Sequence, residues 1–161
     1  MIVSEFVSLD GVMEAPGGEP GYKHSGWVLA VSQDPAQLKY KLDEVLEAKA
    51  LLLGRVTYEG FDELEWNNST LVKGDVADAV SKLKRQDGGD ILVAGSRTLV
   101  HTLIEHDLVD EYRLMVFPII LGSGRRLFPD DAGEKTLLKL VDSEVFDSGV
   151  AVHTYHRARD Q

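Results

Sequence analysis

A buried strand that turns through glycine into a helix is the feature that most constrains this 161-residue chain. Residues 91–94 form a continuously apolar run bounded by Gly89 and Gly95, which is typical of a strand buried on both faces. Apolar residues then recur at helical spacing from Leu99 to Ile104. The first N–H groups of such a helix have no partner within it, so together with the helix dipole they favour an anion such as a phosphate. The alternative is a glycine turn that binds nothing.

Strand-like and helical segments alternate along the rest of the chain. The expected strands, each apolar or alternating, are residues 1–9, 51–53, 69–72, 91–94 and 112–121. Residues 137–146 and 150–156 flank an Asp-Ser-Gly turn and predict a hairpin. The order predicts one α/β domain over residues 1–161, with three layers. Its sheet is mixed and mainly parallel, with helices on both faces and a C-terminal antiparallel hairpin.

Three helix starts can be read from capping residues. Asp34 followed by proline, Thr57 and Asp75 are expected N-caps. The helix after Asp34 carries four apolar residues at helical spacing, which we expect to face the core: Leu38, Leu42, Val45 and Leu46. A glycine- and proline-rich segment, residues 15–26, precedes it and is typical of a functional loop. Trp27 follows, either covering a pocket or packing beneath this loop.

Composition excludes several classes of function. The net charge of −10 repels phosphate backbones and disfavours nucleic-acid binding. No apolar run is long enough to span a bilayer, so we expect no membrane association. The chain has no cysteine, which removes disulfides, thiolate catalysis and thiolate metal sites and indicates a cytoplasmic location. The histidines do not pair on a shared face, so no metal site is expected.

Three glycine turns, at Gly11, Gly54 and Gly95, follow expected strands and map to the carboxyl edge of the sheet, where α/β proteins bind ligands. Four motifs quoted in order are Ser8-Leu9-Asp10-Gly11, Leu53-Gly54-Arg55-Val56-Thr57-Tyr58-Glu59, Val93-Ala94-Gly95-Ser96 and Phe117-Pro118-Ile119-Ile120-Leu121-Gly122. Together they resemble the dihydrofolate reductase superfamily, and more narrowly the bacterial reductase-domain family of riboflavin biosynthesis.

The resemblance implies an NADPH-dependent reductase of a small heterocyclic substrate, such as 5-amino-6-(5-phosphoribosylamino)uracil. It also implies a homodimer built around residues 112–116 and 150–156. The positions that match the family's cofactor-binding residues are Ser8, Leu9, Gly11, Gly54, Arg55, Thr57, Gly95, Ser96, Arg97, Thr98 and Gly122. Two arginines beside helix starts favour NADP. The alternative function is a non-catalytic nucleotide-binding or interaction module that keeps the fold.

Asp10 is the acid in the first glycine turn and the candidate catalytic residue. It could relay a proton to the reduced substrate, or it could accept backbone N–H bonds within the turn.

One departure from the family lies between Phe61 and Asp62, where relatives carry roughly two dozen further residues, enough for a helix and a strand. Either the protein lost this segment or the printed sequence omits it. We favour omission, because deleting a strand leaves a raw edge or a gap in the sheet.

Overall fold

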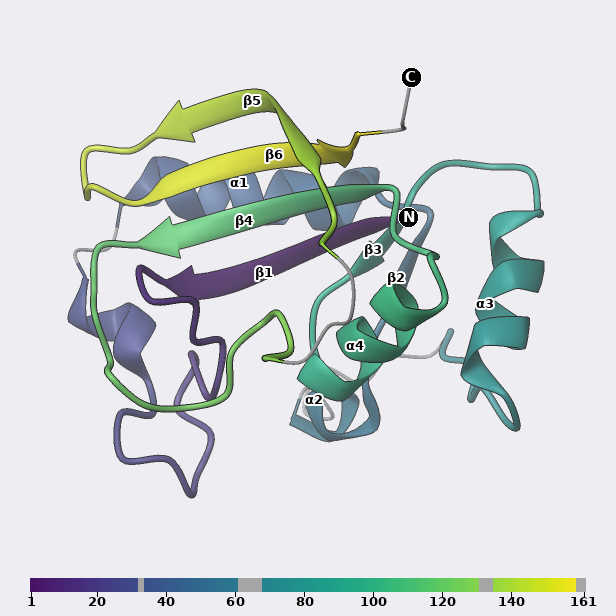
Figure 1. Cartoon of the computed structure of the whole chain (residues 1–161), viewed down its shortest axis with the longest axis horizontal. Helices are drawn as coiled ribbons and strands as arrows, with labels where there is room; N and C mark the ends of the chain where they lie inside the picture. The colour runs from purple at the N-terminus through teal and green to yellow at the C-terminus, as the bar shows by residue number, and fades with distance from the viewer. Residues whose placement is uncertain (32–33, 61–67, 131–134, 159–161) are drawn as a thin grey trace.

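The structure is a computed structural model, and it describes residues 1–31, 34–60, 68–130 and 135–158. In these residues six strands form one sheet in the order β2-β3-β1-β4-β6-β5 (Figure 1). The strands are β1 (Ile2–Ser8), β2 (Ala50–Leu52), β3 (Ile91–Val93), β4 (Glu111–Phe117), β5 (Leu138–Val145) and β6 (Ala151–Arg157). Strands β2, β3, β1 and β4 pair in parallel, whereas β4, β6 and β5 pair antiparallel. The predicted mixed sheet with a C-terminal hairpin is confirmed.

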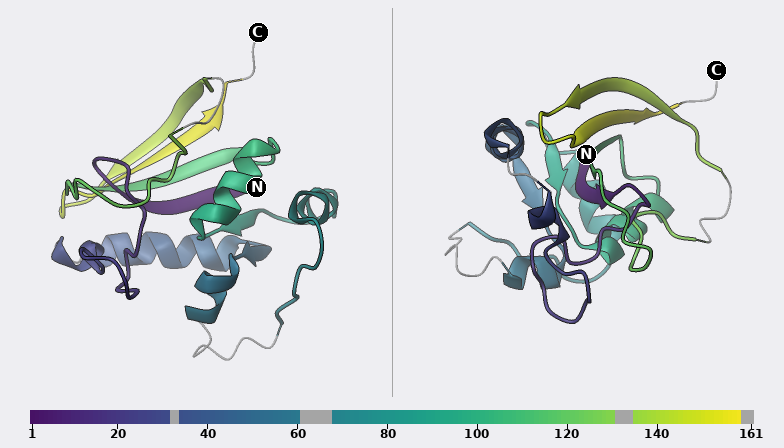
Figure 2. Two further views of the ribbon diagram at one scale, coloured as in Figure 1. Left: turned by 60° about the horizontal axis from the view of Figure 1, so that its bottom comes forward. Right: turned by 90° about the vertical axis from the view of Figure 1, so that its left-hand side faces the viewer.

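Helices cover both faces of the sheet (Figures 1 and 2). Helix α1 (Pro35–Glu47) lies on one face, and α3 (Val76–Lys84) and α4 (Arg97–Glu105) lie on the other. The short helix α2 (Arg55–Gly60) follows β2. On the α4 side, alternate residues of β1 such as Val3 and Val7 pack with Val80 of α3 and Leu103 of α4. On the α1 side, a second cluster gathers around the ring of Phe117.

Capping residues predict two of the helix starts correctly. The side chains of Asp34 and Asp75 accept hydrogen bonds from the first turns of α1 and α3. The cap predicted at Thr57 is wrong, because α2 begins at Arg55 and the Tyr58 N–H already bonds to the Gly54 carbonyl. The strand predicted over residues 69–72 is also wrong: the segment is irregular and exposed, and it pairs with none of the described strands.

Helix α1 turns a polar face, not its apolar stripe, toward the sheet. Leu38, Leu42, Val45 and Leu46, predicted to face the core, are exposed by 42 to 72%. The buried residues of the helix are Gln37 and Glu44.

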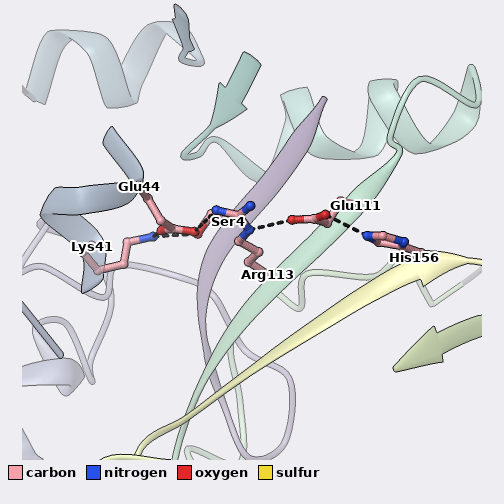
Figure 3. A network of polar contacts seen from close by, with 6 residues as sticks. All are labelled: Ser4, Lys41, Glu44, Glu111, Arg113 and His156. Carbon is pink, nitrogen blue, oxygen red and sulfur yellow. Dashed lines mark hydrogen bonds and ion pairs between the residues drawn. The ribbon is translucent and has the colours of Figure 1, made fainter. Parts of the chain in front are cut away.

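A network of charges explains this orientation of α1 (Figure 3). The carboxylate of Glu44, whose side chain is 3% exposed, accepts from Ser4 Oγ at 2.9 Å and pairs with Lys41 Nζ at 2.7 Å and Arg113 Nη1 at 3.3 Å. Arg113 also pairs with Glu111, which contacts His156. These contacts hold α1 across β1, β4 and β6.

Strand β2 has a paired neighbour on one side only, so it forms one edge of the described sheet. The junction between Phe61 and Asp62 lies outside the described residues, so the predicted missing segment stays a prediction. None of the helices in the described part of the chain has the length and apolar character needed to cross a bilayer.

Candidate functional site

The corners after β2 and β3 lie against each other at the carboxyl edge of the sheet. The Gly54 N–H donates to the Gly95 carbonyl at 3.1 Å. A Cβ added at Gly54 would lie 2.2 Å from Ser96 Oγ, and one added at Gly95 would lie 2.7 Å from Thr57 Oγ1. Gly95 also has a φ of +69°, which disfavours other residues. The two corners are therefore neighbours, as the sequence analysis expects, and glycine is required by their close contact.

Two helix N-termini follow directly from these corners. Ser96 is the N-cap of α4, with its Oγ facing the Leu99 N–H, so the N–H groups of Arg97 and Thr98 lie in the first helical turn. Arg55 opens α2 and is largely exposed, paired with Glu59 at 3.1 Å. First-turn N–H groups have no acceptor within their own helix. Two sets of such donors and a guanidinium group therefore lie close together, an arrangement suited to an anion.

The first glycine turn forms a second group of predicted residues around Asp10. Its carboxylate accepts from Ser8 Oγ at 2.7 Å and from the N–H groups of Leu121 at 3.1 Å and Gly122 at 2.9 Å. Burial raises the pKa of Asp10, but these hydrogen bonds outweigh it and hold the pKa at about 2. The carboxylate is therefore ionised at neutral pH and joins two loops. This geometry favours the backbone-acceptor interpretation, and the catalytic role of Asp10 stays a prediction.

The same turn exposes an apolar side chain at the sheet edge. Leu9 is 63% exposed, while its N–H bonds to the carbonyl of Ile119. Gly11, with a φ of +81°, accepts at its carbonyl from the Leu127 N–H. Trp27 is buried, packs against Phe117 and donates from Nε1 to the Glu14 carbonyl, which favours the interpretation that it packs beneath the loop.

Arg126 connects the two groups of predicted residues. Its Nε donates to the Asp10 carbonyl at 3.1 Å, and its own carbonyl accepts from Arg97 Nε at 2.9 Å. The α4 corner and the first glycine turn thus lie along one continuous edge. The sequence alone does not predict that Arg126 connects these groups, because Arg97 is 29 positions and Asp10 is 116 positions away from it along the chain.

Glu5 is the site residue that sequence reasoning missed. The Gly95 N–H donates to Glu5 Oε1 at 2.6 Å, so one backbone donor of the candidate site is already used. The available signal was a single charge inside an apolar strand, which points to a specific partner.

A cavity of about 960 Å³ opens elsewhere, near the amino ends of β1 and β4, and contains none of the predicted site residues. Acidic side chains beside it already have partners: Asp110 pairs with Lys84 at 2.7 Å, and Glu111 Oε2 lies 2.8 Å from His156 Nε2. Within the described ranges, no group of three or more histidine and acidic side chains is arranged to hold a metal ion. The predicted site residues therefore lie at the glycine corners and not along this cavity.

The fold and the paired corners define a dihydrofolate reductase-like α/β protein. Residues 62–152 match the model of the RibD C-terminal domain family, and because this is more than half of the sequence, the chain belongs to that family. It is 38% identical over 90 residues to the uncharacterized protein YyaP of Bacillus subtilis (strain 168), covering 56% of this chain and 47% of YyaP. It is 32% identical over 97 residues to the uncharacterized protein YwjB of the same strain, covering 60% of this chain and 55% of YwjB. The chain spans about half the length of these curated relatives.

Solved structures share the whole fold at low sequence identity. A putative riboflavin biosynthesis protein from Shewanella sp. PV-4 superposes with a TM-score of 0.73 at 23% identity, covering 98% of both chains. Dihydrofolate reductase from Enterococcus faecalis, in complex with NADP(H), gives 0.63 at 18% identity and covers 98% of this chain and 96% of that one. RibD from Acinetobacter baumannii gives 0.68 at 16% identity, covering 98% of this chain and 57% of that one. The family resemblance drawn from the four motifs is confirmed.

Proposed function

We propose that this protein is an NADPH-dependent reductase of a small heterocyclic substrate. The observation that carries the proposal is the contact between the two strand-to-helix corners, where Gly54 bonds to Gly95. The contact brings the N-termini of α2 and α4 together, and these residues fit the phosphates of a dinucleotide. The family match and the structural likeness to a putative riboflavin biosynthesis protein and to RibD support a ribosylaminopyrimidine as the substrate.

Different residues of the candidate site would bind the phosphates and orient the nicotinamide of the dinucleotide. The first turns of α2 and α4, with Arg55 and Arg97, would hold the phosphates. Ser8, Leu9 and Gly11, with Gly122 beside them, would border the nicotinamide. The bound dinucleotide supplies a hydride, so the protein's contribution is to orient the reactants and exclude water. Leu9 offers apolar surface for this purpose at the edge of the first turn.

A titration with NADPH tests the proposal. We expect enhanced nicotinamide fluorescence in the wild-type protein, followed by loss of absorbance at 340 nm with pyrimidine substrates. The charge-removing variants Arg55→Ala and Arg97→Ala should each weaken NADPH binding about tenfold, the loss of one hydrogen bond to a charged group. Arg85→Ala is the matched control, because this exposed arginine lies at the far end of α3. Equal affinity in all four proteins would contradict the phosphate-binding assignment.

The second candidate is a nucleotide-binding module without turnover. The observation that favours it is the ionised carboxylate of Asp10, with a pKa of about 2, because it holds no proton to donate at neutral pH. Binding of NADPH with no oxidation in the presence of any pyrimidine or pteridine substrate supports this function.

We further propose that two chains pair through the β4-β6-β5 half of the sheet, around residues 112–116 and 150–156. Val145 on β5 is 70% exposed, and Leu140 is 50% exposed. A bulge between Leu140 and Asp142, together with charged residues such as Lys139, disfavours edge-to-edge pairing, so the sheets would pack by their faces.

Light scattering at micromolar concentration should report twice the chain mass. Val145→Glu should shift the protein to a monomer, because a charge in an apolar interface stays unpaired. Leu71→Glu, at an exposed apolar residue of the irregular segment, should not. A monomeric wild-type protein would rule out this pairing.

A further inference from the structure

Glu5 is a charged residue placed in an apolar environment. It lies on the α4 side of β1 with Val3 and Val7 and is 7% exposed. Its register partner on β4 is Leu114. An isolated carboxylate in such surroundings is costly unless it is neutral or hydrogen-bonded.

The one hydrogen bond of Glu5 reaches the candidate site. Its Oε1 accepts from the Gly95 N–H at 2.6 Å, at the corner that also contacts Gly54 and Thr57. Among the described residues, no hydrogen bond reaches the second carboxylate oxygen, Oε2. Oε2 is therefore the oxygen on which Glu5 can carry a proton.

The surroundings of Glu5 favour its protonated form near neutral pH. Burial raises its pKa to about 7, outweighing the Gly95 N–H and Lys41, which lower it. Lys41 of α1 acts on Glu5 through its charge. The helices that start at the Gly54 and Gly95 corners carry Arg55 and Glu59 on α2, and Arg97 and His101 on α4. Arg55 and Glu59 pair with each other, and Arg97 and His101 contact carbonyls of the 126–127 segment.

We propose that Glu5 is a positioning residue that couples dinucleotide binding to its own proton, so that phosphates bind the Gly95 corner more tightly when Glu5 is protonated. The inference rests on the proposed function. An ionised Glu5 places a negative charge next to the Gly95 peptide, at the site where we propose that the phosphates bind. A protonated Glu5 removes this repulsion, while Oε1 still accepts from the Gly95 N–H and Oε2 carries the proton.

The direction of the pH effect follows from the linkage between dinucleotide binding and proton binding at Glu5. The pKa of Glu5 lies near 7 in the free protein. The affinity for NADPH is therefore highest below pH 7 and falls as the pH rises through this value. Because the coupling is reciprocal, dinucleotide binding takes up a proton and raises the pKa of Glu5.

Affinity for NADPH measured at pH 6, 7 and 8 tests the proposal in the full chain. We expect the wild-type protein to bind about four- to fivefold more weakly at pH 8 than Glu5→Gln, with little difference between them at pH 6. Glutamine keeps an oxygen for the Gly95 N–H and mimics the protonated acid. The 2′-phosphate of NADPH itself titrates near pH 6, but it does so equally with both proteins. Glu105→Gln, which removes an exposed carboxylate at the last residue of α4, should keep the wild-type pH profile.

A second measurement needs no variant. Carbon-13 titration of the Glu5 carboxyl in the wild-type protein should show its pKa rise by roughly 0.7 to 1 unit when NADPH is bound, the same coupling expressed as a proton affinity. The Gly95 amide signal should follow the Glu5 titration in the free protein. Identical pH profiles for wild type and Glu5→Gln, or a Glu5 pKa unmoved by NADPH, overturn this proposal alone. Absence of NADPH binding at every pH overturns the proposed function with it.

Discussion

Replacing Glu44 with alanine is expected to lower the free energy of unfolding by about 3 kcal/mol. The Glu44 carboxylate is buried between Lys41 and Arg113 and accepts from Ser4. Removing one partner from a buried ion pair costs about 3–5 kcal/mol, because it leaves the other charge uncompensated. The lower end applies here, since Arg113 keeps its contact with Glu111.

Thermal unfolding provides the measurement for this variant. A loss of this size corresponds to a fall in Tm of roughly 6–12 °C for a domain of this length. Glu47→Ala is the matched control: it removes an exposed carboxylate at the last residue of α1 and should change stability by about 0.5 kcal/mol or less. If the free energies of unfolding of the two variants agree within about 1 kcal/mol, the network in Figure 3 does not hold α1 in place.

Local patterns in the sequence predict the buried strand, two helix starts and the position of the glycine turns. Residues 91–94 were recognised as a buried strand, and β3 occupies Ile91–Val93. Caps at Asp34 and Asp75 were correct because a cap acts within three residues of its own position. Glycine turns after successive parallel strands must share one edge of a sheet, so the contact between the two corners was also predictable.

Long-range pairing accounts for what the sequence could not predict. The apolar stripe of α1 was identified correctly, but its direction depends on Ser4 and Arg113, which are 40 and 69 residues from Glu44. The partner of Glu5 is 90 residues away. The run from Ser69 to Val72 has the composition of a strand, yet it pairs with none of the described strands, and β propensity depends on such neighbours.

Replacing Gly54 with alanine is expected to weaken NADPH binding by about 30- to 100-fold, equivalent to losing 2–3 kcal/mol of charge-assisted hydrogen bonding. The added methyl would lie 2.2 Å from Ser96 Oγ and 2.8 Å from the Ser96 backbone nitrogen. The hydroxyl can rotate away, but the nitrogen moves only if the start of α4 moves. The same overlap should lower the free energy of unfolding by about 1–3 kcal/mol.

Gly60→Ala is the control that separates this overlap from a general effect of replacing glycine. Among the described residues, apart from the chain neighbours and backbone of α2 itself, no heavy atom lies within 4 Å of a Cβ built at Gly60, so this variant should bind NADPH normally and fold as well as the wild type. Parallel NADPH titrations give the affinity of each variant, and denaturant melts give its free energy of unfolding. Because phosphate binding depends on how the two corners are spaced, a Gly54→Ala protein that stays folded and binds NADPH like Gly60→Ala would show that the dinucleotide site does not lie between α2 and α4.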